Sequence, residues 1–186
     1  MNPKIFNFSL VLLVIAFLTG CASKTYLSRA KEEVLPPLNL AYHVQSIEIL
    51  DERVESSTEE MKLPIVSRPD QLIRHRPFLT PPHKAVIEKV IQDNALASGT
   101  PVRAVVTILE SYKEFSATWS SEMEKGFAQV QIRFVDIESG EPITGCDSSG
   151  EFFIQSMDAT PNKMEEVYQI TLKRVVYNCL KYIQNS

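Results

Sequence analysis

An alternation of apolar and polar residues over 127–137 constrains the fold of this chain more than any other feature. The alternating residues are Ala128, Val130, Ile132 and Phe134 on one side, with Gln129, Gln131 and Arg133 between them. Because successive side chains of a strand point to opposite faces, this period of two predicts a strand with one buried face. The other face is polar enough to be solvated or to meet a partner.

Two neighbouring segments have the composition of further strands. The segment 102–115 is rich in β-branched and aromatic residues, and Phe152 and Ile154 fall on one face of 150–157. Between the strands that end near 137 and begin near 150, residues 138–141 read Glu-Ser-Gly-Glu, which favours a turn. The sequence therefore predicts a three-stranded antiparallel meander.

Two helices are predicted from apolar residues at helical spacing. The first begins at Thr80 and Pro81, which suit an N-cap and a first turn, and Gly99 is a usual stop signal. The second begins at Pro161 and runs to about residue 183. Its apolar stripe consists of Met164, Tyr168, Leu172, Val175, Cys179 and Ile183.

A first strand is expected over 43–50, so the element order is βαβββα. Such a chain most easily forms one sheet with its helices packed together, which predicts an α+β two-layer sandwich with a mainly antiparallel sheet and helices on one face. The acidic segment 51–60 is expected to be an exposed loop. The segment 62–82 contains five prolines and is expected to be irregular.

The first residues have the pattern of an export signal. Lys4 supplies a positive start, and 8–18 is a nearly unbroken apolar run. The run ends in Leu18, Thr19, Gly20 and Cys21, which resembles the lipobox of bacterial lipoproteins. The resemblance implies that 1–20 is a signal peptide and that Cys21 receives the lipid. An uncleaved signal anchor is the alternative.

The lipobox resemblance also implies where the protein resides. Several fatty-acid chains, palmitate among them, would hold Cys21 in the membrane almost permanently, whereas one chain gives only marginal affinity. Ala22 and Ser23 follow the cysteine, and the absence of Asp there favours the periplasmic face of the outer membrane over the inner membrane; exposure at the cell surface is a further alternative. Residues 21–41, with their Pro36–Pro37 pair, are expected to form the lipidated cysteine and an extended tether, and 42–186 a single α+β domain.

The composition excludes some classes of partner. The hydrophobic fraction of 44% and the charged fraction of 23% are typical of a folded soluble domain. A net charge of -4 argues against nucleic acid as a partner, because broad affinity for phosphates needs a basic surface. The expected partners are therefore the membrane, through the lipid anchor, and an envelope protein.

Cys146 and Cys179 are the two thiols that remain after Cys21 is modified. In an oxidising compartment, an even number of cysteines commonly means that they form disulfides. Cys146 precedes the last strand, and the final helix returns over a similar length to the level at which Cys146 sits. A disulfide between them is predicted; the alternative is that Cys179 is one more small apolar residue of the helix stripe.

The most unusual polar feature is a basic segment at 68–76. Its arginines Arg68, Arg74 and Arg76 are candidates for contact with an anionic group or an acidic partner, because guanidinium groups recognise phosphate and carboxylate. A solvated loop is the simpler interpretation. Trp119, between two strands of the meander, is a candidate interaction anchor, or it folds onto the edge of the core.

Motifs for catalysis are few. His43, His75 and His83 are isolated in the sequence, and none has the spacing of a metal-binding pair. There is no GxSxG elbow and no glycine-rich phosphate loop. Neither a metal nor another cofactor is expected, and the chain is predicted not to be an enzyme.

Three functions remain open from the sequence. The order of lipobox, tether, strand, helix, meander and long helix resembles the auxiliary lipoproteins of ABC-type envelope transport systems, which implies a non-enzymatic accessory or assembly subunit of a transport or secretion complex. A cell-wall-binding or structural lipoprotein is the second hypothesis. A hydrolase with an unrecognised site is the third.

Overall fold

The computed structural model describes residues 22–65 and 68–185. The chain divides into two compact units, with the boundary between Glu33 and Val34. The first unit contains α2 (Ala22–Glu32). The elements of the second unit are β1 (Leu40–Asp51), β2 (Gln71–His75), α3 (Pro81–Asn94), β3 (Ala95–Ala117), β4 (Glu122–Asp136), β5 (Pro142–Ser156) and α4 (Pro161–Gln184).

The second unit is built on a five-stranded sheet in the order β1-β3-β4-β5, with β2 also paired to β3. The strands β3, β4 and β5 form the predicted antiparallel meander. On the other side of β3, β1 pairs in parallel and β2 antiparallel, one after the other along the strand. The sheet is therefore mixed but mainly antiparallel, and the predicted α+β class is confirmed.

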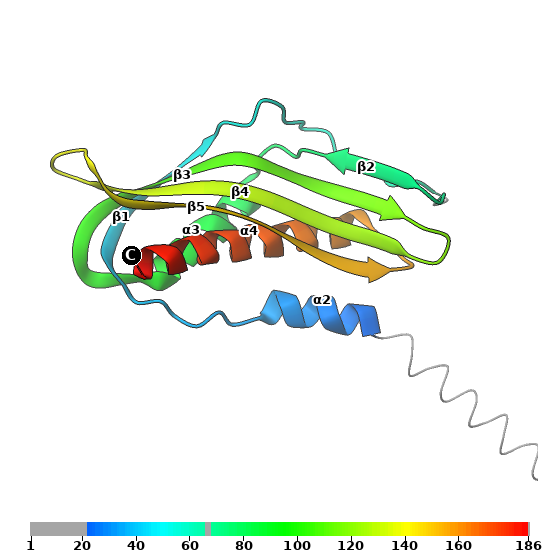
Figure 1. Cartoon of the computed structure of the whole chain (residues 1–186), viewed down its shortest axis with the longest axis horizontal. Coiled ribbons are helices and arrows are strands. Elements are labelled where there is room, and N and C mark those ends of the chain that lie inside the picture. The colour runs from blue at the N-terminus through cyan, green and yellow to red at the C-terminus, as the bar shows by residue number, and fades with distance from the viewer. Residues whose placement is uncertain (1–21, 66–67, 186) are drawn as a thin grey trace, which may run out of the picture. The chain divides into compact units, whose positions relative to one another are not determined.

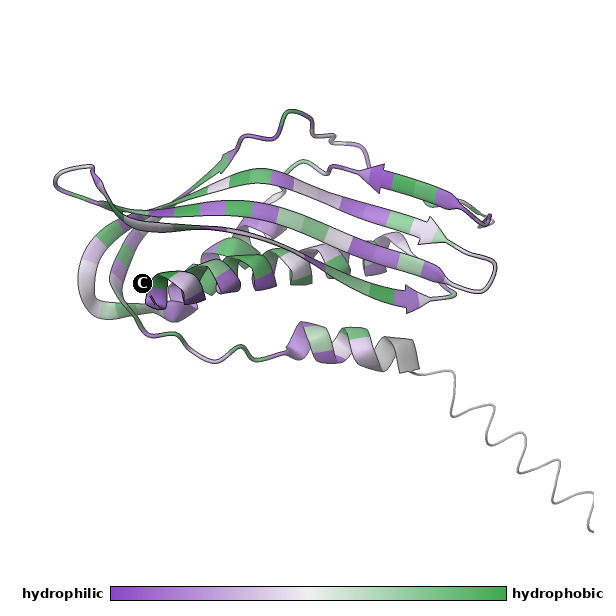
Figure 2. Ribbon diagram, in the orientation of Figure 1, coloured by the Kyte–Doolittle hydropathy of each residue, from purple (hydrophilic) through white to green (hydrophobic). Residues whose placement is uncertain are grey.

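Both helices of this unit lie on the same face of the sheet, as Figure 1 shows. The core contains the apolar residues predicted for 127–137: Ala128, Val130, Ile132 and Phe134 are fully buried. They meet the apolar stripe of α4, which is green on the side towards the sheet in Figure 2. The opposite face of the sheet carries Gln129, Gln131 and Arg133, and no helix among the described residues of this unit lies over it.

The packing of α4 on β4 requires a small residue at position 126. A Cβ atom on Gly126 would overlap Oγ1 of Thr171 and lie 3.1 Å from the Cα of Tyr168. Since both contacts are on α4, the glycine lets the helix approach the strand closely. Thr171 is itself tied to its helix, because its hydroxyl donates to the carbonyl of Val167 (2.8 Å).

Two elements differ from those expected. Gln71–His75, in the segment expected to be irregular, is the short strand β2 and pairs with the end of β3. The helix α3 ends at Asn94, so the expectation that Gly99 ends it is wrong. Gly99 lies in β3, where a Cβ would come within 2.6 Å of the backbone of Ala41 and Tyr42. It permits the close approach of β1 to β3.

The segment expected to be an extended tether also differs. Ala22–Glu32 is helical, which suits its Ala, Leu, Lys, Arg and Glu content, and Arg29 and Lys31 in the last turn favour the helix dipole. In the second unit, Leu38 and Leu40 are 4% and 2% exposed and belong to the core. The body of the domain therefore begins before residue 42.

Candidate functional site

A cavity of about 530 Å³ lies between the segment around Met61, β2, the start of α3 and the first turns of α4. Met61, Phe78 and Met164 form an apolar part of its wall. The ionisable side chains that line it are Glu59, Glu60, His75, His83, Lys113 and Glu165. These residues come from five segments of the chain, so the fold alone brings them together.

His83 is held on both of its ring nitrogens. Its Nδ1 lies 3.1 Å from the backbone nitrogen of Thr80, whose N–H donates to it. Because Nδ1 accepts this bond, the proton sits on Nε2, which donates to Oε1 of Glu165 (2.7 Å). With both nitrogens bonded and the side chain only 2% exposed, His83 has no lone pair left to take a proton from a nucleophile. It is the N3 residue of α3, and its side chain binds the backbone N–H of the N-cap residue Thr80.

Glu165 is the centre of this cluster. Besides the bond from His83, it accepts hydrogen bonds from Nζ of Lys113 (2.5 Å) and from Nε2 of Gln169 (2.7 Å). Burial alone would raise the pKa of Glu165, but the bonds from His83, Lys113 and Gln169 outweigh it and lower the pKa to about 2. The carboxylate is therefore ionised at neutral pH and cannot act there as a general acid.

The cluster continues into the core through Tyr168. The Tyr168 ring packs edge-on against His83 with the ring centroids 5.0 Å apart, and its hydroxyl lies 2.7 Å from Oγ of Ser111. Arg53 Nη1 donates to the same Ser111 oxygen (3.0 Å). Burial raises the pKa of the Tyr168 hydroxyl. These contacts tie α3, β3 and α4 to one another and hold the residue Arg53, which follows β1, against them.

His75 also faces the cavity. Its pKa is lowered by burial and by the positive charge of Lys113. The ring is therefore neutral at pH 7. Among the residues that the structure describes, no group of three or more His, Cys, Asp and Glu side chains is arranged to hold a metal ion.

Two of the three candidate arginines are committed to ion pairs within the chain. Arg74 Nη2 lies 2.6 Å from Glu114 Oε2, and the Arg74 guanidinium stacks 4.1 Å above the Tyr112 ring. Arg76 Nε lies 3.0 Å from Glu110 Oε1. Their charges are thus paired with carboxylates of β3, and their contact with an anionic group or acidic partner stays a prediction. Arg68 is exposed in the turn before β2.

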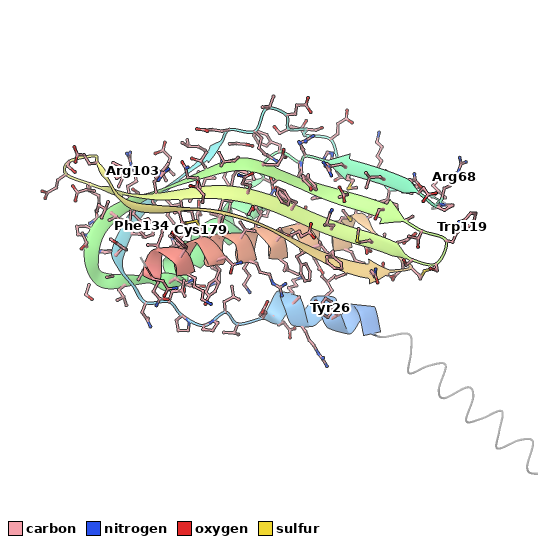
Figure 3. The ribbon with its side chains drawn as sticks, viewed as in Figure 1. Tyr26, Arg68, Arg103, Trp119, Phe134 and Cys179 are labelled. Carbon is pink, nitrogen blue, oxygen red and sulfur yellow. A yellow bond between two sulfur atoms is a disulfide. The ribbon has the colours of Figure 1, made fainter. Side chains whose placement is uncertain are left out.

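Trp119 does not fold onto the core. It is 88% exposed in the turn between β3 and β4, and it lies at the same end of the sheet as Arg68 (Figure 3). The two turns are neighbours, because the N–H of Asp70 donates to the carbonyl of Ala117 (3.1 Å). The structure thus contradicts the folding of Trp119 onto the core edge, and its role as an interaction anchor stays a prediction.

The two core cysteines meet as their positions in the sequence suggest. Cys146 of β5 and Cys179 of α4 form a disulfide with their Cα atoms 5.5 Å apart. Both side chains are buried, at 4% and 0% exposure. The bridge fixes α4 to the last strand. Cys21, the predicted lipidation site, lies outside the described residues.

Sequence reasoning missed a row of charges on the outer face of the sheet. Lys125 Nζ lies 2.5 Å from Glu114 Oε1 and 3.8 Å from Glu151 Oε2, and Arg74 holds the other oxygen of Glu114. Burial acts to raise the pKa of Glu114, but the bonds from Lys125 and Arg74 lower it. The row crosses four strands, and only the register of the folded sheet places its members side by side.

Apolar side chains lie around this row and form what we call the outer-face patch. Its residues are Leu72, Tyr112, Met123, Phe127 and Phe153. Tyr112 and Phe127 stack with their ring centroids 5.0 Å apart, and Leu72 and Phe153 are 61% and 47% exposed. Sequence alternation could have shown that these residues share a face, but the strand pairing was needed to show that they adjoin.

One buried carboxylate stands apart from these clusters. Glu124 is fully buried in β4, and its Oε1 accepts a hydrogen bond from Oγ of Ser156 (2.7 Å). Its Oε2 has no hydrogen-bond partner among the described residues. Burial raises the pKa of Glu124.

Within the described residues, no helix has the length and apolar character needed to cross a membrane. No protein-family model matches the chain. The search of curated proteins gave no match.

Three solved structures show partial similarity in fold. A protein from Caulobacter crescentus CB15 described as a lipoprotein is 10% identical, with a TM-score of 0.36 over 55% of this chain and 75% of that one. A Xanthomonas campestris protein of the DUF330 family is 10% identical, with a TM-score of 0.39 over 82% and 93%. A minor lipoprotein from Acinetobacter baumannii is 11% identical, with a TM-score of 0.36 over 77% and 90%.

Proposed function

We propose that this chain is a lipid-anchored, non-enzymatic accessory or assembly subunit of a bacterial envelope complex, held at the periplasmic face of the outer membrane. The observation that carries the proposal is the outer-face patch together with Trp119. Leu72 and Trp119 leave 61% and 88% of their surface in water. Large apolar side chains gathered on one open face are typical of a protein interface.

Two acid–base groups of the cavity are committed to the fold rather than available for catalysis. A hydrolase needs a nucleophile next to a base that can take its proton. In the cavity, His83 is bonded on both nitrogens and Glu165 is held ionised by three donors. These groups stabilise the junction of α3, α4 and β3.

The lipid anchor is tested by the variant Cys21→Ala. The thiol of Cys21 is the only acceptor for the lipid in the lipobox, so labelled fatty acid should enter the wild-type protein and not the variant. The variant should also accumulate as an uncleaved precursor. Equal labelling of both proteins, or release of a cleaved variant, would contradict the anchor.

The accessory role is tested by affinity purification from detergent-solubilised envelopes. We expect a partner in stoichiometric amount with the wild-type protein, and its loss when Leu72→Ser and Trp119→Ser are combined. The matched control combines Val54→Ser and Ile137→Ser, two exposed apolar residues outside the patch, at 100% and 45% exposure. If the protein instead sediments with purified cell wall and recovers no partner, the accessory role is wrong.

A further inference from the structure

We infer that the free edge of β5 binds an extended, basic segment of a partner protein, which adds a sixth strand to the sheet. This inference rests on the proposed accessory function and names the chemistry of the partner. Among the described residues, β5 pairs with β4 on one side and is the last strand of the sheet on the other. Its backbone groups on that side are available for a new ladder.

The strand β5 is long and regular. It has 15 residues, and its pairing with β4 shows a register shift only near the first residue, between Phe134 and Val135 of β4. The pairing is uninterrupted from Thr144 to Ser156. A straight edge of this length can pair with a partner strand over many residues.

Several of the devices that usually protect an edge strand are missing from β5. Edge strands are commonly protected by lysine, proline, bulges or a very short length. The sequence of β5 contains no lysine or arginine, and its one proline, Pro142, is the first residue. By contrast, β1 has two register shifts, and β2 has five residues with Pro69 and Pro77 on either side. The least protected edge is therefore β5.

The charges of β5 indicate that the partner segment is basic. Its outer-facing row carries Asp147 and Glu151, two carboxylates four residues apart and so roughly 13 Å along the strand at ~3.3 Å per residue. Asp147 receives a hydrogen bond from Gln131 (2.7 Å), and Glu151 lies 3.8 Å from Lys125, which binds Glu114 more closely. Among the described residues Asp147 has no cation at ion-pair distance, and Glu151 shares Lys125 with the closer Glu114, so a strand with lysine or arginine opposite each carboxylate would complement them.

The neighbouring side chains add an apolar requirement. Phe153 follows Glu151 on the same face and is 47% exposed. An apolar residue of the partner, two positions beyond its second basic residue, would pack beside it. A second copy of β5 does not meet these requirements, because β5 contains no basic residue to place opposite Asp147 or Glu151.

The test uses the full mature protein and two blocked nine-residue peptides. The basic peptide is Thr-Val-Lys-Val-Thr-Val-Lys-Thr-Phe, and the acidic one has Glu in place of both Lys. We expect the basic peptide to bind roughly tenfold more tightly, as two cross-strand charge pairs suggest, and its affinity to fall with salt. Hydrogen exchange should slow at alternate backbone amides of β5, the ones that face the free edge.

The variant Asp147→Lys with Glu151→Lys should reverse the preference between the two peptides. The matched control, Glu138→Lys with Glu141→Lys, makes the same charge change in the adjacent turn and should leave the preference as it is. Urea unfolding of each variant checks that the fold is kept.

Three results would overturn the inference: equal binding of both peptides, no binding of either, or protection of amides outside β5. If, without peptide, the β5 amides become more protected from hydrogen exchange as the protein concentration rises, the edge binds a second copy of the chain instead. None of these outcomes depends on the lipid anchor or on recovery of an envelope partner. If the peptide test fails but an envelope partner is still recovered, the inference about the β5 edge is wrong and the proposed accessory function is unaffected.

Discussion

At the scale of single residues, the fold uses many of its charged groups to hold itself together. Arg74, Arg76, Lys113 and Glu165 all have the chemistry of a binding or catalytic residue when the sequence is read alone. In the structure each is engaged by a partner from another element. A charged side chain can be assigned to a ligand only after its internal partners are known.

Arg74 gives the first prediction. We expect Arg74→Ser to lower the free energy of unfolding by about 1–3 kcal/mol, because Glu114, at 5% exposure, loses one of its two cationic partners. The stacking of Arg74 on Tyr112 is lost as well. Urea unfolding at neutral pH measures the change. Arg68→Ser in the same basic segment is the control and should have almost no effect, since Arg68 is exposed. Equal effects of the two substitutions would contradict this account.

Glu124 gives a prediction about pH. Because burial raises the pKa of Glu124 in the folded chain, folding favours its protonated form. Its contribution to stability is complete below the pKa of the unfolded carboxyl and is lost as the pH rises through the folded pKa. Lys163 and Glu122 act on it in opposite directions, the first lowering and the second raising its pKa.

The variant Glu124→Gln has a similar shape and does not titrate. The free energy of unfolding of the wild type, relative to that of the variant, should therefore fall as the pH rises from about 4, near the ordinary pKa of a glutamate carboxyl, through neutral pH. Urea unfolding across this range measures the difference, and Glu138→Gln in the exposed turn serves as control. A difference that stays constant with pH would mean that the environment of Glu124 does not disfavour its charged form.

At the scale of elements, periodicity predicted the meander and both long helices because each buries one complete face. It missed β2, since five residues with prolines on either side are too short for a clear period. It also placed the end of α3 at Gly99, where the glycine serves the contact between β1 and β3. In the sequence, a glycine that lets two backbones approach closely looks the same as a glycine that ends a helix.

The candidate site could not be predicted in this way. His83 and Glu165 are 82 residues apart in the chain, and Lys113 and Glu165 are 52 apart. Each residue alone suits an exposed helix or strand position. Only the packing of α3 and α4 against β3 brings the three side chains together.

Gly126 gives the prediction at this scale. In Gly126→Ala the new methyl group would overlap Thr171 of α4 and press on the backbone of Tyr168. We expect a loss of about 1–3 kcal/mol in the free energy of unfolding, as for other overpacked cores. Combining it with Thr171→Ala, which removes the overlapping oxygen, should restore part of the loss. If the double variant is no more stable than the sum of the single changes predicts, the contact with Thr171 is not the cause.

At the scale of the whole molecule, the core extends further towards the N-terminus than hydropathy suggests. Leu38 and Leu40 are buried. The N–H of Leu38 donates to Oδ1 of Asn94 (2.9 Å), and the hydroxyl of Tyr177 donates to the carbonyl of Pro36 (2.8 Å). The residues that precede β1 in the chain are therefore held by hydrogen bonds to both α3 and α4.

The boundary of the folded domain can be tested by truncation. A chain that begins at Val34 keeps both leucines and should unfold at the same urea concentration as the mature protein, because 34–186 is one compact unit. A chain that begins at Tyr42 loses both leucines. Buried leucines contribute about 2–5 kcal/mol each, and a domain of this size has a net stability of about 5–15 kcal/mol, so most of that stability should be lost. Leu38→Ala with Leu40→Ala in the chain from Val34 should reproduce much of this loss, which would separate the missing apolar contacts from the shortened backbone. Equal midpoints for the chains from Val34 and Tyr42 would place the start of the domain within β1, after Leu40.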